Sequence, residues 1–396
     1  MDTNDPDAKT MYAAAGILGV ILALSNMPTP FYVRWQAEMD FSSSILTILF
    51  AAYILGLLVA LAVTSGLVSR FGERVVILGG MVLATGASCL FAFARAEWVL
   101  LLARGVTGVA VGAVLAAGIP WVTALGGDRR TRLALSLASG AVSTGAGVGP
   151  ILSGVATTAP WDPIVTAFLI EAALLVASTA LALKLPFRGQ SSTVSRGHAG
   201  LLPRVPRRAW RHVGVGVASF GCALGMTAFL LSLGPSVLRD VGTIDGPMIA
   251  GVMASSMFLS GAVVQLPGRR LGPLGALALG GCSTVAAAAA LALTVVLRSP
   301  LPLTASALLA GAGYGLAQLA GLMVIADGIE PPHRPQATAL LNLGGYVPCG
   351  LLPIVAGVAT DALGLTGSSL LFAAIIAALT TTATLLAIQG RARAGA

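Results

Sequence analysis

The sequence predicts an all-α membrane protein with twelve transmembrane helices in two pseudo-symmetric six-helix halves. Hydrophobic residues make up 56% of the 396 residues and charged residues only 10%, whereas soluble proteins carry roughly 25% charged residues. Apolar runs long enough to cross a bilayer, which needs about 20 residues, recur along the chain. The segment Pro150–Thr157 (PILSGVAT) returns about half a chain later as Pro353–Thr360 (PIVAGVAT). This composition excludes an ordinary soluble enzyme.

The apolar runs set the expected order of the helices. They cover 11–33, 42–66, 75–94, 98–121, 132–158, 163–184, 213–238, 247–267, 273–297, 301–326, 335–359 and 366–388. The only long connection between two runs is 185–212, which is rich in Arg, Ser, Gly and Pro. We therefore expect an N-terminal half (1–184), a cytoplasmic linker (185–212) and a C-terminal half (213–396).

The basic residues predict the orientation in the membrane. If the N-terminus lies inside, the outer segments contain only Arg34, Arg95, Arg239 and Arg298, and the inner segments contain most of the other basic residues. The positive-inside rule then places both termini and the linker in the cytoplasm. Lysine is nearly absent beside many Arg and Ala residues, which indicates a GC-rich bacterial genome and hence a bacterial cytoplasmic (inner) membrane.

A glycine motif in the fifth run organises the first half. Gly145, Gly149, Pro150 and Gly154 form G-x-x-x-G-P-x-x-x-G. Gly145 and Gly149 share one bare helix face, against which another helix backbone can pack closely in lipid. Pro150 is expected to bend the helix.

Further repeats relate the two halves. Arg70-Phe71-Gly72 is echoed by Arg270-Leu271-Gly272, and Leu101-Leu102-Ala103 with Gly108 by Leu308-Leu309-Ala310 with Gly315. Parallel repeats of this kind are typical of transporters, in which the substrate lies near mid-membrane between the halves.

These motifs resemble those of the major facilitator superfamily over essentially the whole chain, and most closely those of its proton-coupled drug and metabolite exporters. The second-to-third loop motif of that family, roughly G-x-L-a-D-R-x-G-R-K, is similar to Ser65-Gly66-Leu67-Val68-Ser69-Arg70-Phe71-Gly72-Glu73-Arg74. Ser69 replaces the family's acidic residue, and the first glycine is displaced to Gly66. The resemblance implies cytoplasmic gating contacts from Gly66, Arg70, Gly72, Arg74, Arg269 and Arg270; the alternative is that these arginines only set the topology.

Two other motifs carry the resemblance further. Leu101 to Gly108 is similar to the family's fourth-helix motif, whose arginine, linked there to proton transfer, falls on Arg104. Gly145 to Gly154 is similar to the fifth-helix motif of antiporters, which implies export. The end of the first run, Asn26 to Tyr32, is also similar to the exporter branch.

Two charged residues are expected deep in the membrane, where charges are costly and usually functional. Arg104 could bind an anion or tune a nearby acid, or it could hold helices together through backbone carbonyls. Glu171 is the only carboxylate at mid-membrane depth, and buried carboxylates can carry protons near neutral pH. Its helical neighbours are mostly apolar, so Glu171 could instead be a protonated packing residue. In that case acidic residues at the rim of the membrane, such as Glu38 or Asp40, would couple transport to protons, or transport would not be coupled to protons.

The resemblance also implies that the substrate cavity is lined mainly by the first, second, fourth, fifth, seventh, eighth, tenth and eleventh helices. Polar, aromatic or sulfur-containing side chains on those helices, together with Arg34 as a possible anion ligand, are the candidate cavity residues: Asn26, Arg34, Tyr53, Met226, Phe229, Met257, Phe258, Tyr314, Gln318, Asn342 and Tyr346. The pairs Tyr314–Gln318 and Asn342–Tyr346 each combine a ring with an amide one turn apart, which suits an amphiphilic ligand better than a sugar. Hydrogen bonding between helices is the alternative for each residue.

The remaining patterns exclude other classes. The sequence has no phosphate-binding G-x-x-x-x-G-K-[ST] loop, no Ser/His/Asp arrangement, no metal-binding spacing and no basic face for nucleic acid. A receptor or scaffold would need a signalling domain, and none is recognisable. We therefore expect a monomeric, cofactor-free secondary transporter that exports a small amphiphilic drug or metabolite in exchange for protons. The alternative is an uptake permease or uncoupled facilitator for a small, possibly anionic, metabolite.

Overall fold

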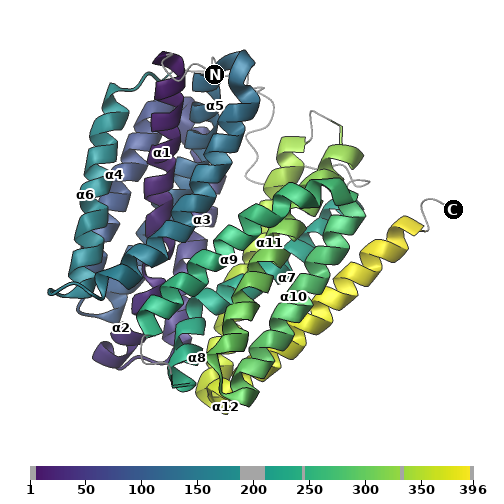
Figure 1. The fold of residues 1–396 in the computed structure, drawn as a ribbon. Coiled ribbons are helices and arrows are strands. Elements are labelled where there is room, and N and C mark those ends of the chain that lie inside the picture. Colours follow the sequence, from purple (N-terminus) through teal and green to yellow (C-terminus); the bar gives the residue numbers. More distant parts are fainter. Residues whose placement is uncertain (1–5, 188–209, 243–245, 331–333, 393–396) are drawn as a thin grey trace. The chain divides into compact units, whose positions relative to one another are not determined.

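The computed structural model describes residues 6–187, 210–242, 246–330 and 334–392, and within these ranges it contains helices and no strands (Figure 1). Most of the predicted linker, residues 188–209, lies outside them. The first half contains α1 (Pro6–Asn26), η1 (Thr29–Phe31), α2 (Tyr32–Met39), α3 (Ser43–Phe71), α4 (Glu73–Ala92), α5 (Glu97–Ala156) and α6 (Pro163–Lys184). The second half contains α7 (Trp210–Ser232), α8 (Gly234–Asp240), α9 (Gly246–Gly268), η3 (Arg269–Leu271), α10 (Gly272–Leu297), α11 (Pro300–Gly328) and α12 (Arg334–Ala392).

Two of these helices are too long for one membrane span. The 60 residues of α5 would extend about 90 Å at about 1.5 Å per residue, roughly three times the bilayer core of about 30 Å. Non-helical backbone at Gly127 (φ 57°, ψ −176°) divides α5, and Gly364 (φ 75°, ψ 166°) divides the 59-residue α12 in the same way. A positive φ is accessible to glycine without strain. Each long helix therefore supplies two predicted spans.

The spans counted from the structure agree with the predicted runs. In the described ranges, eight helical stretches are long and apolar enough to cross a membrane, and the bent pair of α7 and α8, which meet at 51°, is a ninth. Two of the eight, Met248–Leu297 and Leu340–Gln389, are 50 residues long and hold two spans each. The part of α5 after Gly127 is not among these stretches, and it is the helix that corresponds to the remaining predicted run. The expected all-α membrane fold with twelve spans is confirmed.

The first and seventh runs are interrupted, which the run boundaries did not predict. α1 ends at Asn26 and the chain continues through η1 into α2, because Pro28 and Pro30 have no backbone N–H to continue the helix. The seventh run breaks at Leu233 between α7 and α8, two residues before Pro235. The two breaks occupy corresponding places in the two halves.

The chain divides into two compact units that do not coincide with the two predicted halves. Unit 1 comprises Met1–Phe31 and Ala52–Leu201, and unit 2 comprises Tyr32–Ala51 and Leu202–Ala396. The segment Tyr32–Ala51 contains α2 and the beginning of α3. Helix α3 therefore belongs in part to each unit.

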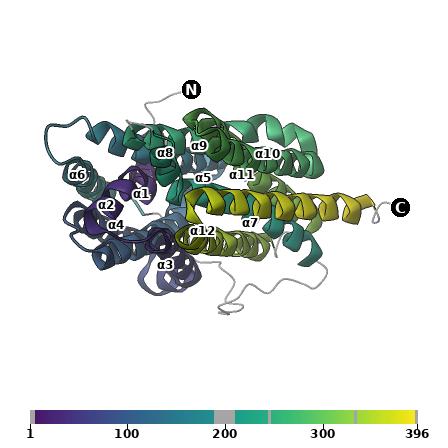
Figure 2. The same ribbon diagram turned by 90° about the horizontal axis from the view of Figure 1, so that it is seen from below.

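Unit 1 is held together by close backbone contacts at glycine. Helices α1 and α5 pack along their lengths, and α4 packs on both α5 and α6 (Figures 1 and 2). A Cβ at Gly145 would overlap the carbonyl oxygen of Gly19, and a Cβ at Gly149 would overlap that of Ala23. The bare face predicted from the G-x-x-x-G spacing is thus the face on which α1 packs.

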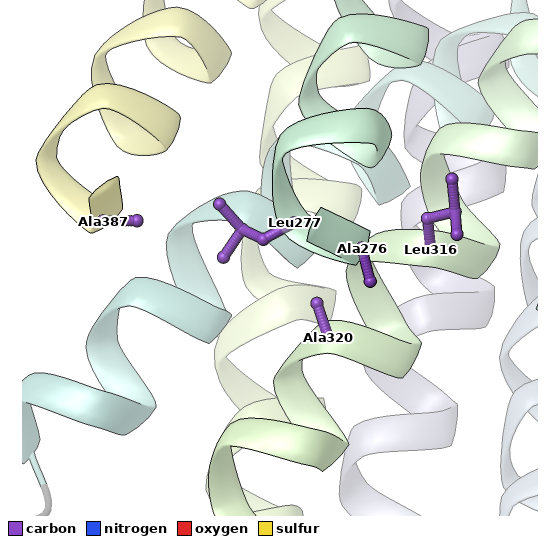
Figure 3. Close-up of a cluster of buried hydrophobic side chains, with 5 residues drawn as sticks. All are labelled: Ala276, Leu277, Leu316, Ala320 and Ala387. Carbon is purple, nitrogen blue, oxygen red and sulfur yellow. The ribbon is translucent and has the colours of Figure 1, made fainter. Parts of the chain in front are cut away.

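Unit 2 uses the same construction. Helix α7 packs on α12, and α11 packs on α9 and α10. A Cβ at Gly315 would overlap the Gly261 carbonyl oxygen of α9, as a Cβ at Gly108 would overlap the Tyr53 carbonyl oxygen of α3. A small apolar core joins α10, α11 and α12 (Figure 3), formed by Ala276, Leu277, Leu316, Ala320 and Ala387. The repeats read from the sequence therefore correspond to equivalent helix contacts.

Candidate functional site

Arg104 lies at the centre of the polar contacts of unit 1. Its side chain is 0% exposed, and its Nη1 donates a hydrogen bond of 2.7 Å to the carbonyl oxygen of Ser25. Its guanidinium carbon lies 5.4 Å from the centre of the Tyr53 ring, within the range of a cation–π interaction. One arginine of α5 therefore contacts the end of α1 and the part of α3 in the same unit.

The end of α1 explains why this arginine is buried there. The last carbonyl groups of a helix have no partner within the helix. Arg104 binds the carbonyl of Ser25, the hydroxyl of Ser153 donates to the carbonyl of Met27 at 2.7 Å, and the amide of Asn26 donates to the carbonyl of Ala146 at 3.2 Å. Side-chain hydrogen bonds between α5 and the end of α1 therefore stabilise the break in the first run.

Glu171 is buried in a different part of unit 1. It is 0% exposed on α6, and neither carboxylate oxygen has a hydrogen-bond partner. One turn earlier, Phe168 stacks on Phe91 of α4 at 4.8 Å and accepts a hydrogen bond of 2.7 Å from Ser88 through its carbonyl oxygen. Glu171 therefore lies on the face of α6 that packs on α4, and no hydrogen bond joins it to Arg104.

The loop motif between α3 and α4 forms a tight turn. Gly72 has φ 84°, a conformation that favours glycine, and Gly272, the first residue of α10, has φ 66°. Arg74 donates a hydrogen bond of 3.2 Å to the Leu183 carbonyl and lies 5.6 Å from the ring centre of Phe187, so it joins the start of α4 to the end of α6. The other motif residues are exposed: Gly66, Arg70, Arg269 and Arg270.

The candidate cavity residues of unit 2 fall into two groups. Met226, Phe229 and Met257 are fully buried, and Phe229 stacks on Phe372 of α12 at 4.2 Å, so Phe229 contributes to helix packing. The partly buried group is available to line a surface of the unit and consists of Phe258, Tyr314, Gln318, Asn342 and Tyr346.

Tyr314 has the best-defined surroundings in that group. Its ring lies 5.8 Å from that of Phe220, and its hydroxyl interacts with the side chain of Gln318, as their one-turn spacing predicts. Arg34, the proposed anion ligand, forms an ion pair with Glu38 one turn away at 2.6 Å.

Two residues with structural roles were not singled out from the sequence. The hydroxyl of Ser153 in α5 donates a hydrogen bond to the Met27 carbonyl. Asp361 directly follows the repeated segment Pro353–Thr360, and its carboxylate accepts the backbone N–H groups of Ser43 and Ser44 at 3.0 and 3.1 Å. The signal in the sequence that could have identified Asp361 is an acidic residue at the end of an apolar run. In the described ranges, no group of three or more His, Cys, Asp or Glu residues could hold a metal ion.

Repeated apolar helices with broken first and seventh spans and a buried arginine and glutamate define a multi-spanning membrane protein. Residues 11–301 match the Major Facilitator Superfamily, and the chain belongs to this family. It is therefore a transport protein rather than an enzyme.

Solved structures share this fold. A variant of the nucleoside transporter NupG superimposes with a TM-score of 0.78 at 13% identity, covering 95% of this chain and 99% of the other. A bacterial homolog of the human lysosomal transporter Spinster, in an inward-facing and unoccupied conformation, gives 0.77 at 14% identity, covering 97% and 98%. Comparison with curated proteins finds no significant match.

Proposed function

We propose that this protein is a proton-coupled antiporter that exports a small amphiphilic drug or metabolite by alternating access. The observation that carries the proposal is Glu171, a fully buried carboxyl group on a spanning helix with no hydrogen-bond partner for either oxygen. Buried polar groups in proteins are nearly always hydrogen-bonded, so an exception of this kind calls for an explanation.

The chemistry of an isolated carboxyl group supplies that explanation. An ionised carboxylate without a partner or a counter-charge is strongly destabilised in an apolar surrounding, so the packed arrangement of α4 and α6 favours the protonated acid. A change that admits water or a cation to Glu171 would favour loss of the proton. The residue could therefore take up a proton in one conformation and release it in another.

The direction and the ligand class rest on other residues. The glycine motif of α5, which resembles that of antiporters, packs directly on α1 through Gly145 and Gly149, and this supports exchange in the direction of export. The partly buried pairs Tyr314–Gln318 and Asn342–Tyr346 each combine a ring with an amide. Such surfaces suit a largely apolar ligand with a few polar groups.

The repeats and the distribution of charges support a mode of transport and an orientation in the membrane. The six-helix halves 1–184 and 213–396, connected by residues 185–212, would rock relative to each other about a central substrate site. Both termini would lie in the cytoplasm of a bacterium, with the chain a monomer in the inner membrane. Arg104 would maintain the end of α1 at this site, and the arginines of the inner loops would act in gating.

An uptake permease or uncoupled facilitator is the second candidate. Glu171 faces the packing between α4 and α6 rather than a polar surface, as a structural acid would. One structure with a similar fold is that of a nucleoside transporter, which favours a small metabolite as cargo.

Substitution of Glu171 separates the two candidates. In proteoliposomes, Glu171→Gln should abolish substrate accumulation driven by a pH gradient but retain exchange of labelled for unlabelled substrate, because the amide is uncharged and cannot release a proton. Glu97→Gln is the matched control, since Glu97 is exposed in the first turn of α5, and it should retain both activities. Unchanged pH-driven accumulation in Glu171→Gln would favour the second candidate.

A further inference from the structure

The beginning of α3 is capped by a residue more than 300 positions away in the sequence. The Asp361 carboxylate accepts the backbone N–H of Ser43 at 3.0 Å through Oδ1 and that of Ser44 at 3.1 Å through Oδ2, and it also accepts the hydroxyl of Ser44. The first N–H groups of a helix have no partner within the helix, and an anion at this end is further stabilised by the helix dipole. Asp361 thus acts as an N-terminal cap supplied by another helix.

The two helices also touch through their backbones at this point. Gly357 lies one turn before Asp361 on α12, and a Cβ placed there would overlap the Thr47 hydroxyl and lie 2.8 Å from the Ser43 carbonyl oxygen. Thr47 is completely buried. The carboxylate cap and the glycine contact together cover a little more than one turn of α3.

The capped segment occupies a distinctive place in the chain. Tyr32–Ala51 comes from the first half of the sequence but belongs to unit 2, where α2 also contacts α8. From Ala52 onward, α3 belongs to unit 1. The bond between Asp361 and α3 therefore attaches a segment of the first half to α12 of the second half.

We propose that Asp361 is a detachable helix cap, a latch that holds the Tyr32–Ala51 segment on α12 in one conformation of the transport cycle and releases it in the other. This inference rests on the proposed alternating access, which requires the two halves to separate at one end in each cycle. After release, the backbone N–H groups of Ser43 and Ser44 would bind water.

The start of α3 can survive release because it has a second cap. The N–H of Ile45 donates to the hydroxyl of Ser42 at 3.4 Å, and the N–H of Leu46 donates to the Ser42 carbonyl at 3.2 Å. Serine is among the preferred N-cap residues. Loss of the Asp361 bond should therefore change the position of the segment without unfolding the helix.

The latch can be tested by the accessibility of position 47. Thr47→Cys would be introduced, the protein purified in lipid nanodiscs, and the rate of maleimide labelling at position 47 measured by mass spectrometry, so that the native cysteines can remain. Adding Asp361→Ala should raise this rate about 2- to 30-fold, the range that corresponds to the loss of a helix cap. The control is Asp162→Ala, because Asp162 caps α6 through the N–H groups of Ile164 and Val165 within its own helix; it should leave labelling at position 47 unchanged.

A second variant keeps the test decisive if Asp361→Ala does not fold. Ser43→Pro removes one N–H that Asp361 binds, and proline is well tolerated at the first position of a helix. It should raise labelling by a smaller factor. If Asp361→Ala folds and labels at the parent rate, the latch is overturned. If Asp361→Ala does not fold, unchanged labelling in Ser43→Pro overturns it.

The outcome is independent of the proposed function, because labelling needs neither substrate nor a proton gradient. Increased labelling in a protein that transports nothing would support the Asp361 cap and contradict the proposed transport function. Proton-coupled transport with unchanged labelling would support the proposed function and contradict the Asp361 cap.

Discussion

The guanidinium of Arg104 and the backbone carbonyl of Ser25 are joined by a hydrogen bond of 2.7 Å in a fully buried setting. Ser25 belongs to the last turn of α1, immediately before the break at Pro28 and Pro30. The arginine therefore forms a hydrogen bond with a carbonyl group that has no partner within the broken helix. Its guanidinium also lies over the ring of Tyr53 and so contacts α3. This hydrogen bond is the helix-holding contact suggested by the sequence, and a residue that holds α1 in place can also affect a nearby acid or substrate.

Arg104→Ala should destabilise the protein, because it leaves the Ser25 carbonyl buried without a partner. The expected cost is about 1–3 kcal/mol, visible as a lower melting temperature of the purified protein. Arg95→Ala is the control, since Arg95 is exposed, and it should melt like the parent. An Arg104→Ala variant as stable as the parent would show that the hydrogen bond does not hold α1.

The packing of α5 on α1 predicts a strong difference between two glycines of one helix. A Cβ at Gly149 would overlap the Ala23 carbonyl oxygen, whereas a Cβ at Gly140 would meet nothing within 4 Å. Gly149→Ala should therefore destabilise the protein by about 1–3 kcal/mol through overpacking. Gly140→Ala should be neutral or slightly stabilising, because alanine favours helix. Equal melting temperatures for the two variants would contradict the close contact.

Substitution of Glu171 is expected to have opposite effects on stability and on function. Because neither oxygen has a partner, Glu171→Leu should keep or raise the melting temperature, since replacing an unsatisfied polar group with an apolar one of similar size is neutral or stabilising. The same variant should lose substrate accumulation driven by a pH gradient. A melting temperature several degrees below that of the parent would mean that the carboxyl group has a partner that stabilises the fold.

The sequence alone predicted the fold class and much of the helix packing, because both depend on local patterns. The spacing of Gly145 and Gly149 marks a bare helix face, and hydropathy marks the spans. The deep positions of Arg104 and Glu171 also follow from their places within apolar runs, and both are fully buried.

Contacts between distant segments could not be predicted in this way. Nothing in a single sequence relates Asp361 to Ser43, because hydrogen-bonded residues far apart along the chain share no periodic pattern. The contact of Phe229 with Phe372 from the last span is another such case, since an aromatic residue suits a helix interface as well as a binding surface; its place in a substrate cavity stays a prediction. The interruption of the first run at Pro28 could have been predicted from the proline itself.

Proton flux measures most directly whether transport by this protein is coupled to protons. Proteoliposomes with an internal pH indicator would hold a pH gradient while amphiphilic cations, neutral antibiotics, nucleosides, sugars and organic anions are added one at a time. We expect at least one amphiphilic compound to dissipate the gradient with the parent protein and with Glu97→Gln, but not with Glu171→Gln or with empty liposomes. If a compound crosses the membrane through the parent protein while the gradient remains unchanged, the protein is an uncoupled facilitator and not a proton-coupled antiporter.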